Sequence, residues 1–152
     1  MRYDMKPLEN IVRTALVLVL AVTTLAACDS PTEPDDHAAG VVFLRADGSE
    51  AARFVFAPRA LTGGLSVAVG QSVTYRLRVL TEGGAIVPVD GAEYSIRDPR
   101  IVITLAASIA IENNDQLVIT GGATPRNTSV LFDLWHASHI EFQVSGVPLA
   151  VQ

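Results

Sequence analysis

The sequence predicts an all-β fold, with strands arranged as a sandwich or a barrel. From Val41 onward, short apolar or alternating segments are separated by turn residues about every 8–12 positions, which is typical of such folds. The clearest strand is 72–80, where Tyr75 and Leu77 alternate with Arg76 and Arg78. No segment beyond the N-terminal leader has helical periodicity. We therefore expect one β domain over residues 41–152.

Residues 1–27 have the pattern of a secretion signal. Basic residues at Arg2, Lys6 and Arg13 are followed by a run of roughly 13 apolar or small residues that ends at Ala27. A membrane-crossing helix needs about 20 such residues, so the run is short for a span. Cleavage after the run is the prediction, and an uncleaved anchor helix is the alternative.

The run ends in Leu25-Ala26-Ala27-Cys28, which resembles the lipobox of bacterial lipoproteins. The resemblance implies that the Cys28 sulfur carries a diacylglyceryl group and that its freed amine is acylated, for example with palmitate. Two or three acyl chains anchor a protein stably, whereas one is marginal. Cys28 is the only cysteine, so an internal disulfide is excluded. Asp29 resembles an inner-membrane retention signal of enterobacteria. That signal does not hold across all bacteria, so the sequence leaves open whether the protein lies on the periplasmic or the outer surface of the cell envelope.

Residues 28–40 are expected to form a tether. Pro31 and Pro34 alternate with acidic residues, and the segment has little to bury. Proline and like charges both favour an extended, solvated chain. The lipid and the domain would thus be joined by a flexible link.

The domain begins with strands expected on both sides of recognisable turns. Asp47-Gly48 is a hairpin turn, while Gly83-Gly84 and Asp90-Gly91 bracket a short strand. The strands expected in this half are Val41–Ala46, Ala52–Ala57, Leu65–Val69, Ser72–Leu80, Ala85–Val89 and Ala92–Arg97.

The second half follows the same rule. Asp98-Pro99 and the polar residues 113–115 are expected turns. The strands expected here are Ile101–Leu105, Ile109–Glu112, Gln116–Thr120, Thr128–Trp135, Ile140–Val144 and Val147–Val151. Trp135 is expected in the core, and Arg76 and Arg78 on a solvated face.

Part of this domain resembles the group 2 bacterial immunoglobulin-like domains of surface proteins. The resemblance rests on Leu65–Ser72, Tyr75–Leu80 and Tyr94–Pro99, and on later strands at Leu117–Gly122 and Thr128–Leu134. It departs from that family at Tyr94, where a tryptophan is usual, and in the extra hairpin over residues 41–62. It implies an immunoglobulin-like β-sandwich that binds a protein or carbohydrate partner, or acts as a spacer.

Catalytic and nucleic-acid-binding motifs are missing from the sequence. It holds no G-x-S-x-G, no phosphate-binding glycine loop and no HExxH, so we do not expect an enzyme. The net charge is −5, and no basic stretch is visible, which argues against nucleic acid as a partner.

The three histidines, His37, His136 and His139, are the candidate metal ligands. His136 and His139 flank a turn between two strands that should pair, so their imidazoles should lie close together. His37 would be a third ligand if the tether folds back, and Glu141 is a nearby carboxylate. Imidazole and carboxylate suit Zn²⁺ or Cu²⁺. The alternative is that these are ordinary polar loop residues.

Two pairing registers are possible for the strands that this turn connects. A two-residue turn at Ala137-Ser138 is disfavoured, since neither residue readily adopts positive φ. A looser loop from Trp135 to His139 would place Phe132 and Leu134 on the same face as Ile140, and this register is preferred because it buries more apolar surface. The sequence thus predicts a lipid-anchored, non-catalytic binding or structural module, with metal binding as the alternative function.

Overall fold

The computed structural model describes residues 37–152, which form eleven strands and no helix. The predicted leader, the Cys28 lipidation site and the tether up to residue 36 lie outside the described residues. The strands are β1 (Ala38–Leu44), β2 (Glu50–Val55), β3 (Ala60–Gly63), β4 (Leu65–Val67), β5 (Ser72–Thr81), β6 (Ile86–Pro88), β7 (Tyr94–Ile101), β8 (Ala107–Glu112), β9 (Gln116–Gly121), β10 (Arg126–His136) and β11 (His139–Val151).

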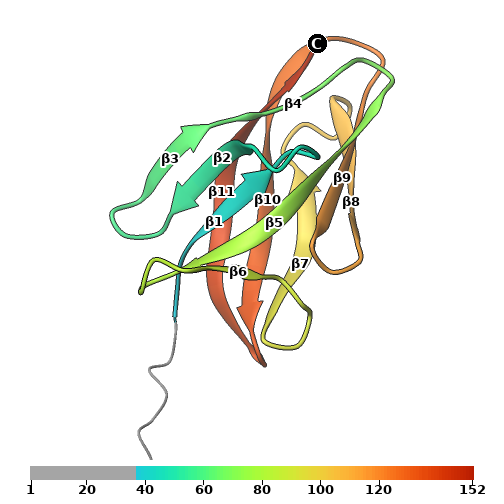
Figure 1. Ribbon diagram of the computed structural model, residues 1–152. Coiled ribbons are helices and arrows are strands. Elements are labelled where there is room, and N and C mark those ends of the chain that lie inside the picture. The colour runs from blue at the N-terminus through green and yellow to red at the C-terminus, as the bar shows by residue number, and fades with distance from the viewer. Residues whose placement is uncertain (1–36) are drawn as a thin grey trace, which may run out of the picture. The chain divides into compact units, whose positions relative to one another are not determined.

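The strands form two sheets, so the all-β sandwich predicted from the sequence is confirmed. The larger sheet has seven strands in the order β3-β2-β1-β5-β9-β8, with β6 beside β5. The smaller sheet has four strands in the order β4-β11-β10-β7. Figure 1 shows the long strands β10 and β11, in orange and red, behind β1 and β5. Asp36–Gln152 forms one compact unit.

The core lies between the two sheets. The alternation predicted for β5 is confirmed, because Tyr75, Leu77 and Val79 are all buried. Phe43 of β1 meets Phe132 of β10 edge to face, with ring centroids 6.0 Å apart. A buried tyrosine needs a partner for its hydroxyl, and the Tyr75 hydroxyl donates to the Ser66 carbonyl and accepts from the Ser66 amide. These contacts tie the larger sheet to β4 of the smaller one.

Several element boundaries differ from the sequence predictions. β1 begins at Ala38, so the end of the predicted tether belongs to the first strand. Asp98-Pro99 lies inside β7 and does not form the predicted turn. The strand is locally irregular there, because Asp98 has a positive φ of 51°. Residues 102–105 form no strand, because the Ala106 amide donates to the Ile103 carbonyl and closes a turn.

The preferred register of the β10–β11 hairpin was wrong. The turn consists of Ala137-Ser138 alone, with His136 directly opposite His139, and Ala137 has a φ of 49°. Ile140 pairs with Trp135 across the strands, and a register shift between Leu134 and Trp135 separates this pair from the rest of the ladder. Ile140 is therefore half exposed and does not join the core.

Trp135 was also misplaced by the prediction. It is partly buried outside the core, and the Arg97 guanidinium lies 4.0 Å from the centre of its indole ring. Its neighbour Leu134 is fully buried. Because consecutive residues of a strand face opposite sides, burial of Leu134 directs Trp135 to the outer face of the sheet.

Candidate metal centre

Three separate elements bring the histidine cluster together, which we define as His37, His136, His139 and Glu141. His37 directly precedes β1, His136 ends β10, and the other two residues open β11. The short Ala137-Ser138 turn holds the two hairpin histidines opposite one another. The His37 carbonyl accepts a hydrogen bond from the Glu82 amide at 3.0 Å, which fixes the start of β1 beside β5.

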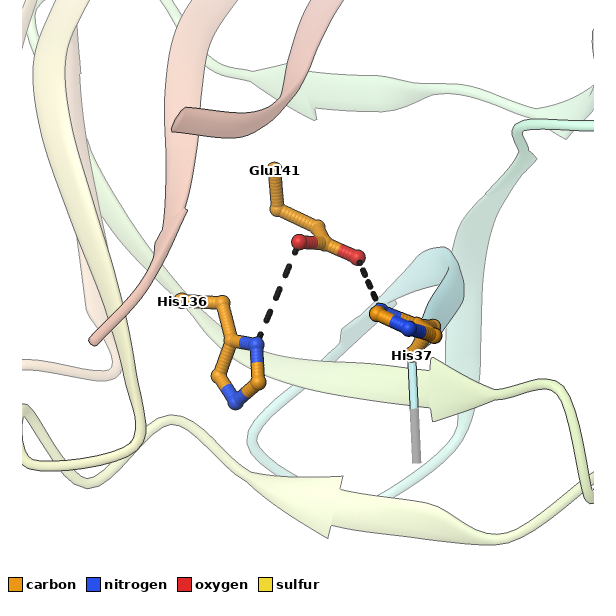
Figure 2. Close-up of side chains that lie close together, drawn as sticks. All are labelled: His37, His136 and Glu141. Atoms are coloured by element: carbon orange, nitrogen blue, oxygen red, sulfur yellow. Dashed lines mark hydrogen bonds and ion pairs between the residues drawn. The ribbon is translucent and has the colours of Figure 1, made fainter. Parts of the chain in front are cut away.

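The Glu141 carboxylate is the centre of the cluster. Its Oε1 lies 3.2 Å from His37 Nδ1, and its Oε2 lies 3.2 Å from His139 Nε2 and 3.9 Å from His136 Nδ1. Figure 2 shows the carboxylate pointing between the rings of His136 and His37. One carboxylate is thus approached by three imidazoles.

Burial differs sharply among the four side chains. The Glu141 side chain is 10% exposed and that of His136 is 19% exposed, whereas His37 and His139 are more than half exposed. His136 Nδ1 is fully buried and has no hydrogen-bond partner. A buried polar atom left without a partner costs free energy unless something else binds it. This nitrogen faces the carboxylate at a distance too long for a hydrogen bond and wide enough for a bridging ligand.

The His136 ring is oriented by the first residue of β7 and the segment just before it. Tyr94 stacks on it with ring centroids 4.9 Å apart, and Glu93 Oε1 lies 3.9 Å from His136 Nε2. Asp90 holds this segment by accepting hydrogen bonds from the amides of Glu93 and Ala92, and these bonds lower the pKa of Asp90. A carboxylate near the second ring nitrogen is the usual support of a metal-binding imidazole.

The donor set fits a transition metal ion. His37, His136 and Glu141 each offer one ligand atom, and all three atoms lie within 4.8 Å of one another. Two ligands about 2 Å from one Zn²⁺ lie roughly 3.3 Å apart in a tetrahedral site, so no pair has to close by more than about 1.5 Å. The His37 side chain is half exposed and is therefore free to move.

The rings of His37 and His136 lie 6.5 Å apart, a proximity that the sequence allowed only if the segment before the domain folds back. The second hairpin histidine, His139, is outside this three-residue group, although its ring lies 5.7 Å from that of His136. Glu141, considered only a nearby carboxylate, is the central residue. Glu93 and Tyr94 were missed, since no spacing in the sequence connects residues 93–94 with a turn more than forty positions later.

Comparison with known proteins gives no relative: no family model, no curated protein and no solved structure matches this chain. Within residues 37–152, no helix has the length and apolar character needed to cross a membrane.

Proposed function

We propose that this chain is a lipid-anchored, non-catalytic binding module of the bacterial cell envelope, and that its sandwich holds a divalent transition metal ion. The observation that carries the metal proposal is the buried, unpartnered Nδ1 of His136 beside the Glu141 carboxylate. His37 supplies the third donor. The proposal thus combines the two functions that the sequence offered as alternatives, a non-catalytic binding module and a metal-binding protein.

The chemistry of the donors selects the metal. Two imidazole nitrogens and one carboxylate oxygen suit Zn²⁺ or Cu²⁺, whereas Mg²⁺ and Ca²⁺ prefer oxygen ligands throughout. The nearly buried Glu141 carboxylate contributes the negative charge that a dication needs. We therefore expect the site not to bind Mg²⁺ or Ca²⁺.

The position of His139 favours a structural metal site over a catalytic one. Structural zinc sites have four protein ligands, while catalytic sites keep a position open for water. The exposed His139 side chain already contacts Glu141, and a rotation about its side-chain bonds can direct Nε2 to the same ion. A closed set of three histidines and one glutamate stores or senses a metal ion.

The anchor proposal rests on the sequence. The basic and apolar leader and the Leu25–Cys28 segment support lipidation at Cys28. The metal donor His37 follows that cysteine by nine positions. The metal site would therefore be joined to the lipid by a short stretch of chain, on the periplasmic or outer surface.

Metal binding is tested by calorimetry on residues 29–152, with a chelator in competition. We expect one Zn²⁺ or Cu²⁺ per chain and no heat from Mg²⁺. The double variant His37→Ala and His136→Ala should lose this binding while its circular dichroism spectrum stays unchanged. Equal binding by the wild type and the double variant would contradict the metal proposal.

Lipidation is tested separately in bacteria that express the full chain. Mass spectrometry should find a mature N-terminus at an acylated Cys28, and Cys28→Ser should move the protein out of the membrane fraction. A wild-type chain that keeps residues 1–27, or has a free thiol at Cys28, would contradict the anchor proposal without affecting the metal proposal.

A further inference from the structure

The smaller sheet has an open edge at β11. Within residues 37–152, β11 pairs with β10 along nearly its whole length, but with β4 only at Leu149–Val151. The other side of His139–Pro148 has no strand partner in the described chain. Every second residue of such an edge presents its backbone N–H and C=O to whatever lies beside it.

A groove of about 660 Å³ runs over this edge. On the core side, its wall includes Phe56, whose ring stacks on Phe142 with centroids 3.8 Å apart. On the outer side, Gln143 and Asp133 are paired across the strands and both line it. Lining residues on both faces of β11 show that the groove follows the strand edge.

The lining of the groove includes exposed apolar side chains. Ile140 and Phe142 are among the few large hydrophobic side chains in the described chain that are substantially exposed, at 45% and 38%. Two of the usual guards of an open edge are missing from most of β11, because no lysine follows Lys6 and the first proline of β11 is Pro148. An exposed edge with apolar side chains is a ready template for a further strand.

The accessible charges in the groove are positive, because Arg59 and Arg100 are both exposed. Arg59 Nη2 donates to the neutral Ser145 hydroxyl at 2.6 Å, and Arg100 has no ion-pair partner among the described residues. The two carboxylates of the groove are largely hidden from solvent: Asp133 is buried and accepts from Gln143, and the Glu141 side chain is 10% exposed and belongs to the histidine cluster. A carboxylate brought into the groove would replace the neutral partner of Arg59 by a charged one, which is the stronger hydrogen bond.

We propose that the β11 edge binds an extended peptide segment of a partner protein, in which acidic side chains alternate with apolar ones. The peptide adds a strand to the smaller sheet through main-chain hydrogen bonds. Its apolar side chains cover Phe142, and its carboxylates, which alternate with them, pair with Arg59 and Arg100. The groove shares Glu141 with the histidine cluster, but peptide binding requires no metal ion and can be tested with the metal removed.

The test uses residues 36–152, the compact unit, in buffer with EDTA. The probe is a capped heptapeptide in which glutamate alternates with valine; two comparison peptides carry lysine in place of glutamate, or N-methyl groups at alternate amides. Nuclear magnetic resonance should show shifts confined to the β11 edge and the groove. We expect the glutamate peptide to bind about tenfold more tightly than the lysine peptide, and the N-methylated peptide to lose binding.

Charge reversal in the protein completes the test. Arg59→Glu with Arg100→Glu should weaken the glutamate peptide about tenfold or more, while Arg126→Glu, at the far end of β10, should leave its affinity within about twofold. Equal affinity for the glutamate and lysine peptides, retained affinity after N-methylation, shifts outside the groove, or no binding would each overturn the proposal. Self-association of the chain through β11 would overturn it too, since the occupant would then be a second copy.

Discussion

Two clusters of charged or titratable side chains join residues that are far apart in the sequence. They differ in whether each polar group of the cluster has a hydrogen-bond or ion-pair partner. In the arginine cluster, defined as Arg76, Arg78 and Asp115, the Arg78 guanidinium lies 2.7 Å from the carboxylate and also donates to the Leu77 carbonyl. In the histidine cluster, one carboxylate meets three imidazoles, and a buried ring nitrogen has no partner.

The difference distinguishes a structural contact from a candidate binding site. An arginine is permanently charged, so the arginine cluster is complete with protein atoms alone. A neutral imidazole has one N–H donor and one lone pair, and a carboxylate can accept only from the donor. His136 Nδ1 has no hydrogen-bond partner, so protein atoms alone leave the histidine cluster incomplete.

The largest expected effect is that of Glu141→Gln on metal binding. The amide keeps the shape of the side chain but removes its charge, so the affinity for Zn²⁺ should fall about 100-fold or more, equivalent to about 2.7 kcal/mol. Calorimetry measures the loss. Glu112→Gln, the same change at an exposed position of β8, is the control and should leave the affinity unchanged. Similar losses in both variants would mean that Glu141 is not a ligand of the metal ion.

Asp115→Asn should have the reverse profile. Losing the charged partner of Arg78 should lower the free energy of unfolding by about 1–2 kcal/mol, a value reduced by the partial exposure of both side chains. Urea denaturation measures this change. The affinity for Zn²⁺ should stay at the wild-type value, and a weaker affinity would show that the clusters are coupled through the larger sheet.

His139→Ala should give a smaller effect on the metal than Glu141→Gln. If His139 is the fourth ligand, its loss opens one coordination position and weakens Zn²⁺ about tenfold, or about 1.4 kcal/mol. X-ray absorption should then show one nitrogen ligand fewer. An unchanged spectrum would leave a three-ligand site with an open position, which would remove the argument against catalysis.

Asp90→Ala should have the smallest effect, because the side chain is exposed and its hydrogen bonds are screened by water. The folded state lowers the pKa of Asp90 below its ordinary value of 3.8, through bonds from the Glu93 and Ala92 amides. The resulting stabilisation, under about 1 kcal/mol, is present at neutral pH and is lost as the pH falls through the lowered pKa. Thermal melting of both proteins should therefore differ at pH 7 and converge in strong acid.

The sequence predicted the regular strands well and the irregular backbone poorly. The alternation through Tyr75 and Leu77 fixes one face of β5, since burial follows a period of two in a half-buried strand. The Ala137-Ser138 turn carries no local signal, because alanine at positive φ is adopted only when the flanking ladder imposes it. β11 continues through Gly146, at a φ of 79°, where the sequence suggested two strands.

The candidate site was predictable only in its local part. The proximity of His136 and His139 follows from any hairpin between their strands. The contact of His37 with Glu141 spans 104 positions and depends on how the two sheets stack, which no local pattern encodes. Burial of the Glu141 carboxylate depends likewise on the register shift between Leu134 and Trp135.

The position of β1 in the larger sheet has a mechanical consequence. β1 lies between β2 and β5 and is antiparallel to both. Tension applied at Ala38 along the strand axis loads the hydrogen bonds on both sides in shear, so many must break at once. A strand held at the rim would instead unzip one bond at a time. The first strand of the domain, which follows the proposed anchor, is therefore held in a way that resists tension along its axis.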